Sequence, residues 1–335
     1  MSAVDLASLF DMLPPETGQA DDVTRLSATP IPGFGRHRLA RCANSAPAIL
    51  VASRDQLHCN YAAPVVLEHL AIQYDTECRI LQPTGMSERG IFTLITCVDP
   101  DPQLRSYFLR IAGVVIEAVG DNPSRLEISR TMDALIDLFR ALAVPPRKSV
   151  QGLWAELFVI ARSREPERLA RAWHATPGDT FDFAEGGERV EVKSAAGPLR
   201  AHHFSLAQLR SIPATQVLIV SMFVARVGAG ESVQDLLAAL RARLDGNPQT
   251  ILRLESIVAA TLGNTLRRAL GETFDRQLAE SSRAFYRAGD VPSIADPFDP
   301  RVSDIHFVAD LTSVLGIELT EIPSDGLRAA VRETQ

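Results

Sequence analysis

The chain has 335 residues, enough for two domains, and its 46% hydrophobic and 22% charged content is that of an ordinary folded protein. The longest apolar stretches, 111–116 and 217–225, are too short or too polar to cross a bilayer, and the first residues lack the basic region of a signal peptide. Four isolated cysteines have neither a zinc spacing nor a disulfide framework, so we expect buried thiols and a cytoplasmic protein: Cys42, Cys59, Cys78 and Cys97.

Residues 1–145 predict a small α+β domain whose role the sequence does not reveal. A short helix (4–12) and a polar loop ending near Gly33 come first. Three strand-like runs (48–52, 65–74 and 91–98) and two helical patterns (102–119 and 124–142) follow. The pair Pro145-Pro146 breaks this pattern, so we place a domain boundary there and assign 146–335 to a second domain.

The second domain begins with a helix, 150–164, that is apolar on nearly every side, as expected of a buried helix. Glu156 stands in its middle. Because an ionised carboxylate is costly to bury alone, Glu156 must have a charged partner, a metal-bound water or a place at the rim of a cleft. A glutamate that points outward, or pairs with Arg162 or Arg164, is the simpler alternative.

A predicted hairpin carries the most informative residues of the chain. Residues 180–184 and 189–194 both alternate with a period of two, and Gly186-Gly187 is a strong two-residue turn signal. In that register Phe183 pairs with Val190 and Asp182 faces Glu191. Lys193 then lies two residues along on the same face as the two carboxylates.

The facing carboxylates favour a bound cation, because like charges directly opposed across a strand pair destabilise it. Hard oxygen ligands suit Mg²⁺ or Mn²⁺. Lys193 is one of only two lysines beside thirty-two arginines, which favours chemistry over mere surface charge at this position. The alternative is a surface hairpin whose polar face meets water, with Arg189 and Lys193 softening the repulsion.

Further elements follow the hairpin. Ser205 with Gln208 three residues later has the capping-box pattern, which is an alternative to a role for Gln208 in a site. A nearly continuous apolar run predicts a buried strand at 217–224. The remaining patterns predict three helices near 233–244, 250–263 and 277–286, a strand at 305–311 and a final helix.

The chain resembles the bacterial PD-(D/E)xK motif proteins, which are similar to restriction endonucleases and occur among phage-defence genes. The resemblance rests on four segments: Gly152-Leu153-Trp154-Ala155-Glu156-Leu157, Phe181-Asp182-Phe183, Glu191-Val192-Lys193-Ser194 and His203-Phe204-Ser205-Leu206-Ala207-Gln208-Leu209. It implies a restriction-endonuclease-like core (αβββαβ) over residues 148–225, followed by a mixed C-terminal extension. No proline precedes Asp182, and Asp179 offers a rival aspartate. We prefer Asp182 because only this residue falls opposite Glu191.

The resemblance further implies a metal-dependent endonuclease that hydrolyses DNA in a defence or restriction system. Its site residues would be Glu156, Asp182, Glu191, Lys193 and Gln208, with Mg²⁺ or Mn²⁺ held by Asp182, Glu191, Glu156 and the carbonyl of Val192. Lys193 would position the attacking water, and Gln208, His202 and His203 could orient phosphate or solvent.

Several questions about function stay open at this point. A DNA-binding or interaction subunit that kept the fold but does not cut is the alternative, and an RNA nuclease is a weaker one. The net charge of −7 is unfavourable for nucleic-acid binding, although basic residues outnumber acidic ones over 146–270. DNA is the expected partner; protein partners of a defence system and a homodimer stay open, and no membrane is expected.

Overall fold

The computed structural model describes residues 5–15, 24–42, 44–55, 62–81, 86–174, 178–210, 215–294 and 301–332. The chain divides into two compact units. The first comprises residues 1–145 with 245–267, and the second comprises 146–244 with 268–335. The break after Pro145 lies where the sequence places a boundary. Residues 245–267, which the sequence analysis groups with the second domain, belong to the first unit.

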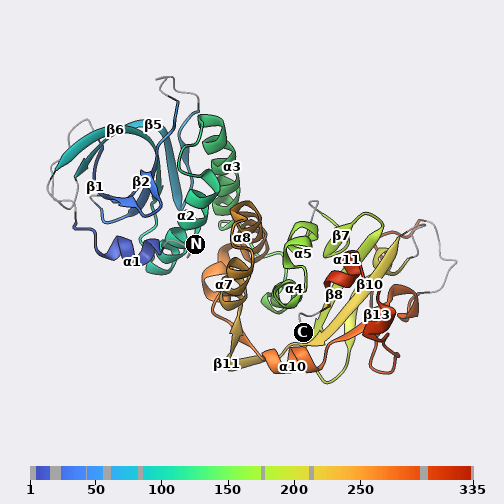
Figure 1. The fold of residues 1–335 in the computed structure, drawn as a ribbon. Helices are drawn as coiled ribbons and strands as arrows, with labels where there is room; N and C mark the ends of the chain where they lie inside the picture. Colours follow the sequence, from blue (N-terminus) through green and yellow to red (C-terminus); the bar gives the residue numbers. More distant parts are fainter. Residues whose placement is uncertain are drawn as a thin grey trace. The chain divides into compact units, whose positions relative to one another are not determined.

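A closed barrel forms the centre of the first unit (Figure 1). Its hydrogen-bonded strand order is β1-β2-β3-β6-β5, and parallel pairing of β1 with β5 closes the ring. The short strand β4 pairs with the other half of β5. The bounds are β1 Thr24–Ile31, β2 Phe34–Arg41, β3 Pro47–Val51, β4 Val65–Val66, β5 Leu70–Leu81 and β6 Ser87–Cys97.

The strands β1 and β2 are not predicted from the sequence. Their inward positions are largely small residues such as Ala28 and Ala40, which fill the narrow interior of a five-stranded barrel but give little hydrophobic periodicity. The expected strands further along are present as β3, β4 with β5, and β6. Of the cysteines, Cys42, Cys78 and Cys97 are free and at least partly buried, whereas Cys59 lies outside the described residues.

Helices cover the barrel of the first unit, and their ends follow the sequence signals. The bounds are α1 Leu6–Asp11, α2 Pro102–Val119, α3 Arg125–Ala141 and α8 Pro248–Leu262. Asp101 caps α2, and Ser124 forms a capping box with Glu127 at the start of α3. α8 packs against α2 and α3, which explains why residues 245–267 join this unit. The described helices include none that could span a membrane.

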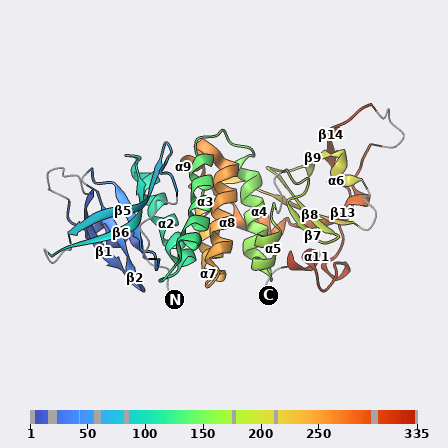
Figure 2. The same cartoon turned by 90° about the horizontal axis from the view of Figure 1, so that it is seen from above.

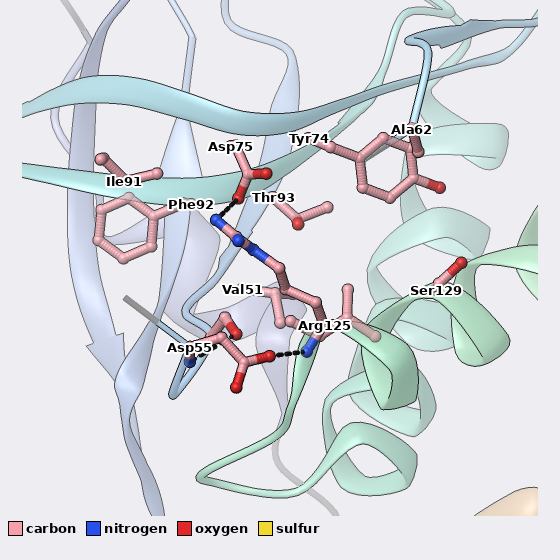
Figure 3. A pocket seen from close by; sticks show the side chains of 12 residues that line it. Val51, Asp55, Ala62, Tyr74, Asp75, Ile91, Phe92, Thr93, Arg125 and Ser129 are labelled. Atoms are coloured by element: carbon pink, nitrogen blue, oxygen red, sulfur yellow. Dashed lines mark hydrogen bonds and ion pairs between the residues drawn. The ribbon is translucent and has the colours of Figure 1, made fainter. Parts of the chain in front are cut away.

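The first unit has a hollow of about 350 Å³, lined by residues of the barrel and of α3. Figure 3 shows the side chains that line it. The Arg125 guanidinium donates to Asp75 Oδ1 over 2.8 Å, and the backbone N–H of Arg125 donates to Asp55 Oδ2 over 2.8 Å. Asp75 has a left-handed backbone (φ 47°) at a bulge in β5, so its carboxylate turns from the ladder toward α3. The ion pair thereby ties the barrel to the start of α3.

The second unit contains a mixed four-stranded sheet in the order β13-β10-β8-β7. The helices α4 and α5 pack against β8 and β7 of this sheet (Figure 2). β8 is antiparallel to β7 and parallel to β10. The bounds are α4 Val150–Arg162, α5 Pro166–Ala172, β7 Phe183–Glu185, β8 Glu188–Ala195, β9 Ala201–Ser205, α6 Leu206–Leu209, β10 Gln216–Phe223 and β13 Ala284–Arg287.

The expected αβββαβ core is only partly present. The order helix, hairpin, strand, short helix and strand occurs as α4, β7, β8, β9, α6 and β10. However, β9 leaves the sheet and pairs with β14 (His306–Asp310) in a separate two-stranded sheet. The third strand of the expected core is therefore not confirmed, although the mixed α+β class is.

The C-terminal half of the second unit is more mixed than the sequence predicts. The expected helix at 277–286 is wrong in its second half, where the chain forms β13 against β10, because apolar residues at 284–286 complete the buried edge of the sheet. The remaining elements are β11 Arg226–Ser232, α7 Val233–Arg243, α9 Leu266–Ala269, β12 Thr273–Phe274, α10 Arg276–Ser281 and α11 Leu327–Ala330.

Candidate active site

The hairpin turns where its glycines predict, and its register is confirmed as far as the strands extend. β7 ends at Glu185 and β8 begins at Glu188, with Gly186 left-handed at φ 52°. Phe183 pairs with Val190. The ladder stops there, so Asp182 does not form a regular cross-strand pair. Instead its backbone N–H donates to Glu191 Oε2 over 3.3 Å, which still brings the two acids together.

Asp182 is held by two backbone N–H groups, one from β8 and one from the segment after α5. Its Oδ2 accepts a hydrogen bond of 2.8 Å from the backbone N–H of Val192. Its backbone carbonyl accepts from the N–H of His174 over 2.9 Å. The carboxylate side chain is only 6% exposed. Asp182 is therefore fixed in position by backbone hydrogen bonds.

Glu156 points from α4 into the same region, with its side chain 4% exposed. Trp173 Nε1 donates to Glu156 Oε2 over 2.8 Å, and His174 Nε2 lies 3.0 Å from the same oxygen. Glu156 thus faces the sheet rather than solvent. The alternative that it pairs with Arg162 does not hold, since Arg162 contacts Glu231 and Glu280.

Lys148, in the loop before α4, bridges two of the acids. Its Nζ lies 2.8 Å from Glu156 Oε1 and 2.9 Å from Asp182 Oδ1. The same nitrogen lies 3.4 Å from His174 Nε2. A positive charge therefore already stands among the side chains that could bind a metal.

The second lysine belongs to a neighbouring group on β8 and α6. Lys193 Nζ lies 2.7 Å from Glu191 Oε1 and 3.3 Å from Gln208 Oε1, and 4.8 Å from the centre of the Phe204 ring. Gln208 Nε2 donates to Glu191 Oε1 over 2.7 Å and to the carbonyl of Thr180 over 3.0 Å. Both lysines of the chain thus contact the buried acids.

Gln208 serves in both of the ways that the sequence leaves open. Its Oε1 accepts from the backbone N–H of Ser205 over 3.1 Å, which completes the capping box at the start of α6. Its Nε2 reaches Glu191 at the same time. A cap and a site contact are therefore not alternatives here, because the short helix points its first turn at the hairpin.

Burial and neighbouring charge act on the three acids in different directions. Burial alone would raise the pKa of Glu156, but the hydrogen bond with His174 and the charge of Lys148 lower that pKa to about 2. Burial and the charge of Glu156 raise the pKa of Asp182 above its ordinary value. Burial and the charge of Asp182 raise the pKa of Glu191 to about 8, against the pull of Lys193. Divergent carboxyl pKa values in one place are typical of functional sites.

An open groove of about 620 Å³ runs beside this cluster. Lys193 and Gln208 line its inner end, and His203, Arg210 and His306 line its outer part. Lys193 therefore faces an open groove, and Arg210 in its lining is a side chain able to bind phosphate.

The remaining residues considered from sequence lie elsewhere. His202 is buried, and its Nε2 lies 2.8 Å from Ser221 Oγ, so it supports the sheet rather than the site. His203 is exposed in the groove. The rival Asp179 is partly exposed and lines a separate surface hollow with Arg189.

Sequence reasoning missed three residues of the cluster: Lys148, Trp173 and His174. One signal for Lys148 was available, because the chain has only two lysines and the other lies in the motif. His174 gives no such signal. It reaches Glu156 through a left-handed backbone (φ 42°) after α5, which sequence spacing does not reveal.

Among the described residues, one group has the side chains and spacing to hold a metal ion: Glu156, His174 and Asp182, whose candidate ligand atoms lie within 4.8 Å of one another. Glu191 is not in that group. Its oxygens accept from Lys193, from Gln208 and from the backbone N–H of Asp182. That Asp182 and Glu191 share one ion stays a prediction.

One family model matches the chain, over residues 31–312, and is described as "Putative PD-(D/E)XK family member, (DUF4420)". The chain belongs to this family. Neither a curated protein nor a solved structure matches it. The match includes most of the barrel of the first unit as well as the whole acidic cluster, so the similarity to the PD-(D/E)XK family DUF4420 extends over both units.

The residues of this PD-(D/E)XK family member fit a divalent cation. Two buried carboxylates and an imidazole converge on one point, and an ammonium group already lies there. Buried carboxylates are unfavourable without a nearby positive charge. Carboxylate ligands suit Mg²⁺, Ca²⁺ and Mn²⁺, whereas an imidazole ligand suits transition-metal ions such as Zn²⁺ and Fe²⁺.

Proposed function

We propose that the chain is a metal-dependent endonuclease that hydrolyses DNA phosphodiester bonds, acting in a bacterial defence or restriction system. The observation that carries the proposal is the meeting of three buried carboxylates, Glu156, Asp182 and Glu191, with Lys193 at the inner end of an open groove. Membership in the PD-(D/E)XK family supports the same reading.

Asp182 would be the central metal ligand, because it lies between the Glu156 side and the Glu191 side of the cluster. Glu156 and His174 would complete the ligand set on one side. Glu191 and the carbonyl of Val192 are the further ligands that the family resemblance implies. A bound divalent cation would polarise the scissile phosphate and lower the pKa of a water molecule.

Lys193 would supply the positive charge that steadies a phosphate as negative charge develops. Its ammonium is held by Glu191 and Gln208 and packs over Phe204, so it is oriented before substrate arrives. A charge held in place in this way needs no reorganisation during the reaction. Gln208 would position both Lys193 and Glu191 through its amide group.

DNA as the substrate is supported by the side chains of the groove and by the excess of basic residues over 146–270. Arg210, His203 and His306 lie along the groove, where they could contact phosphates on either side of the cut. The acidic character of the rest of the chain favours dependence on a partner protein for tight DNA binding.

Single-turnover cleavage tests the proposal. The substrates are supercoiled plasmid, phage DNA with modified bases and structured RNA, each with Mg²⁺ or Mn²⁺, and the comparison is wild type against Asp182→Asn. We expect metal-dependent cutting of DNA by the wild type alone. Cutting of RNA only would replace the proposal with an RNA nuclease.

A second candidate is a subunit that binds DNA without cutting it. One observation favours it: Lys148 places an ammonium group between Glu156 and Asp182, where a catalytic ion would bind. If this ammonium is never displaced, no catalytic ion binds there, and the chain keeps the nuclease fold without cutting DNA. DNA binding without cleavage under every metal condition would support this candidate.

A further inference from the structure

Lys148 lies at the point where the candidate metal ligands converge. Its Nζ is 2.8 Å from Glu156 Oε1, 2.9 Å from Asp182 Oδ1 and 3.4 Å from His174 Nε2. These are the same three side chains whose ligand atoms are close enough to hold one ion. An ammonium and a divalent ion cannot occupy this point together, because they need the same oxygens and repel each other.

We propose that Lys148 is a built-in counter-ion of the metal-free protein, and that a divalent cation enters between Glu156, His174 and Asp182 only by displacing the Lys148 ammonium group. The inference rests on the proposed function, since it concerns the loading of the same site. It assigns Lys148 to the control of metal binding and His174 to the ligand set.

The two carboxylate ligands are held in place, whereas Lys148 is able to move. Val192 holds Asp182, and Trp173 holds Glu156, and both carboxylate side chains are at most 6% exposed. The Lys148 side chain is 39% exposed and comes from a loop. Its flexible four-carbon stem allows the ammonium to leave toward solvent without disturbing the ligands.

Lys193 provides a contrast. Its side chain is 15% exposed, and it is held by Glu191, Gln208 and the ring of Phe204. A divalent ion bound by Glu156, His174 and Asp182 does not need the oxygens that Lys193 contacts. The two lysines are thus expected to respond differently to a metal, one leaving its position and one staying.

Metal binding to the full-length protein tests the exchange. Calorimetric titration with Mn²⁺ compares wild type, Lys148→Met and Arg147→Met, the last being an exposed cation next in sequence. We expect Lys148→Met to bind Mn²⁺ about tenfold more tightly than wild type, a difference of about 1.4 kcal/mol. Arg147→Met should stay within about twofold, because general loss of positive charge is screened by solvent.

The outcomes separate this inference from the proposed function. Wild type that binds Mn²⁺, with Lys148→Met no tighter, overturns the exchange and leaves the metal site in place. Absence of Mn²⁺ binding in both proteins overturns the exchange and the metal-dependent function together.

A measurement on wild type keeps the inference falsifiable even if Lys148→Met does not fold. The chain has two lysines, so acetylation by an amine-specific reagent, followed by mass spectrometry, reports each of them separately. We expect Mn²⁺ to increase the labelling rate of Lys148 several-fold and to leave that of Lys193 unchanged. A Lys148 rate that Mn²⁺ does not change, or slows, overturns the exchange.

Discussion

The backbone N–H of Val192 donates to Asp182 Oδ2 over 2.8 Å, from the strand position between Glu191 and Lys193. This bond ties the first acid of the motif to the segment that carries the other two charged residues. It takes the place of a cross-strand pair at Asp182, because the regular pairing of β7 with β8 ends at Phe183. The geometry of the cluster therefore depends on a side chain that bonds to the opposite strand.

Asp182→Asn should abolish divalent-ion binding and leave the protein folded. Burial and the charge of Glu156 raise the pKa of Asp182, so the ionised carboxylate opposes folding at neutral pH. A neutral amide removes that cost, and its oxygen can still accept from Val192. We expect a melting temperature in chelator equal to or above that of wild type, measured by fluorescence of Trp154 and Trp173, which are both buried in the second unit.

A melting temperature of Asp182→Asn that falls equally in chelator and in Mn²⁺ would contradict this reading. In that case the carboxylate would be a structural residue and not part of a metal site. Asp179→Asn is the matched control, because Asp179 is partly exposed and stands close by in the sequence. It should change neither Mn²⁺ binding nor stability.

Lys193→Arg should fold and bind DNA but lose most cleavage. The ammonium fits between Glu191, Gln208 and the Phe204 ring, and a longer planar guanidinium cannot take the same position. Loss of one oriented electrostatic donor costs about 10²–10³ in rate. Single-turnover cleavage gives the rate, and DNA affinity is measured separately. Near-wild-type cutting would show that Lys193 contributes charge alone.

Acid should destabilise the second unit through His202. Burial, with the charges of Lys193 and Arg200, lowers the pKa of His202 from 6.5 to about 4. Between these values the unfolded chain binds more protons than the folded protein. The free energy of unfolding should therefore fall as the pH drops from about 6.5 to 4, by up to roughly 3 kcal/mol.

Urea unfolding at pH 7 and pH 4.5 checks this dependence, followed by tryptophan fluorescence. His202→Gln cannot titrate, so it should lose less stability than wild type between the two pH values. The control His306→Gln removes a histidine that is 60% exposed and should keep the wild-type dependence. Equal acid sensitivity of wild type and His202→Gln would remove His202 as its cause.

Arg125→Met should destabilise the first unit. The Arg125–Asp75 pair has side chains only 17% and 16% exposed, and removing one partner leaves a largely buried carboxylate without its counter-charge. We expect the free energy of unfolding to fall by about 2 kcal/mol.

The control is Arg89→Met, from the exposed pair with Glu77, which should cost less than about 0.5 kcal/mol. Because both tryptophans lie in the second unit, far-UV circular dichroism is the measurement. Equal effects of the two substitutions would contradict the tie between barrel and helix.

The sequence by itself determined the elements whose signals are local. The glycines at 186–187 specify the hairpin turn, Ser124 and Glu127 specify the start of α3, and the apolar helix from Val150 to Arg162 carries Glu156 inward. These depend on backbone conformation and on capping within a few residues, which a single sequence records directly. The motif residues Asp182, Glu191 and Lys193 come together because one hairpin carries all three.

The tertiary structure alone decided the features that depend on contacts between distant parts of the chain. The barrel closes because β1 pairs with β5 about fifty residues away, and its small inward residues give no periodic signal. The strand β9 pairs with β14 instead of joining the sheet. Lys148 reaches Glu156 from the loop before α4, and His174 reaches it from the loop after α5. Sequence spacing specifies neither contact, because the first depends on a long side chain and the second on a left-handed residue.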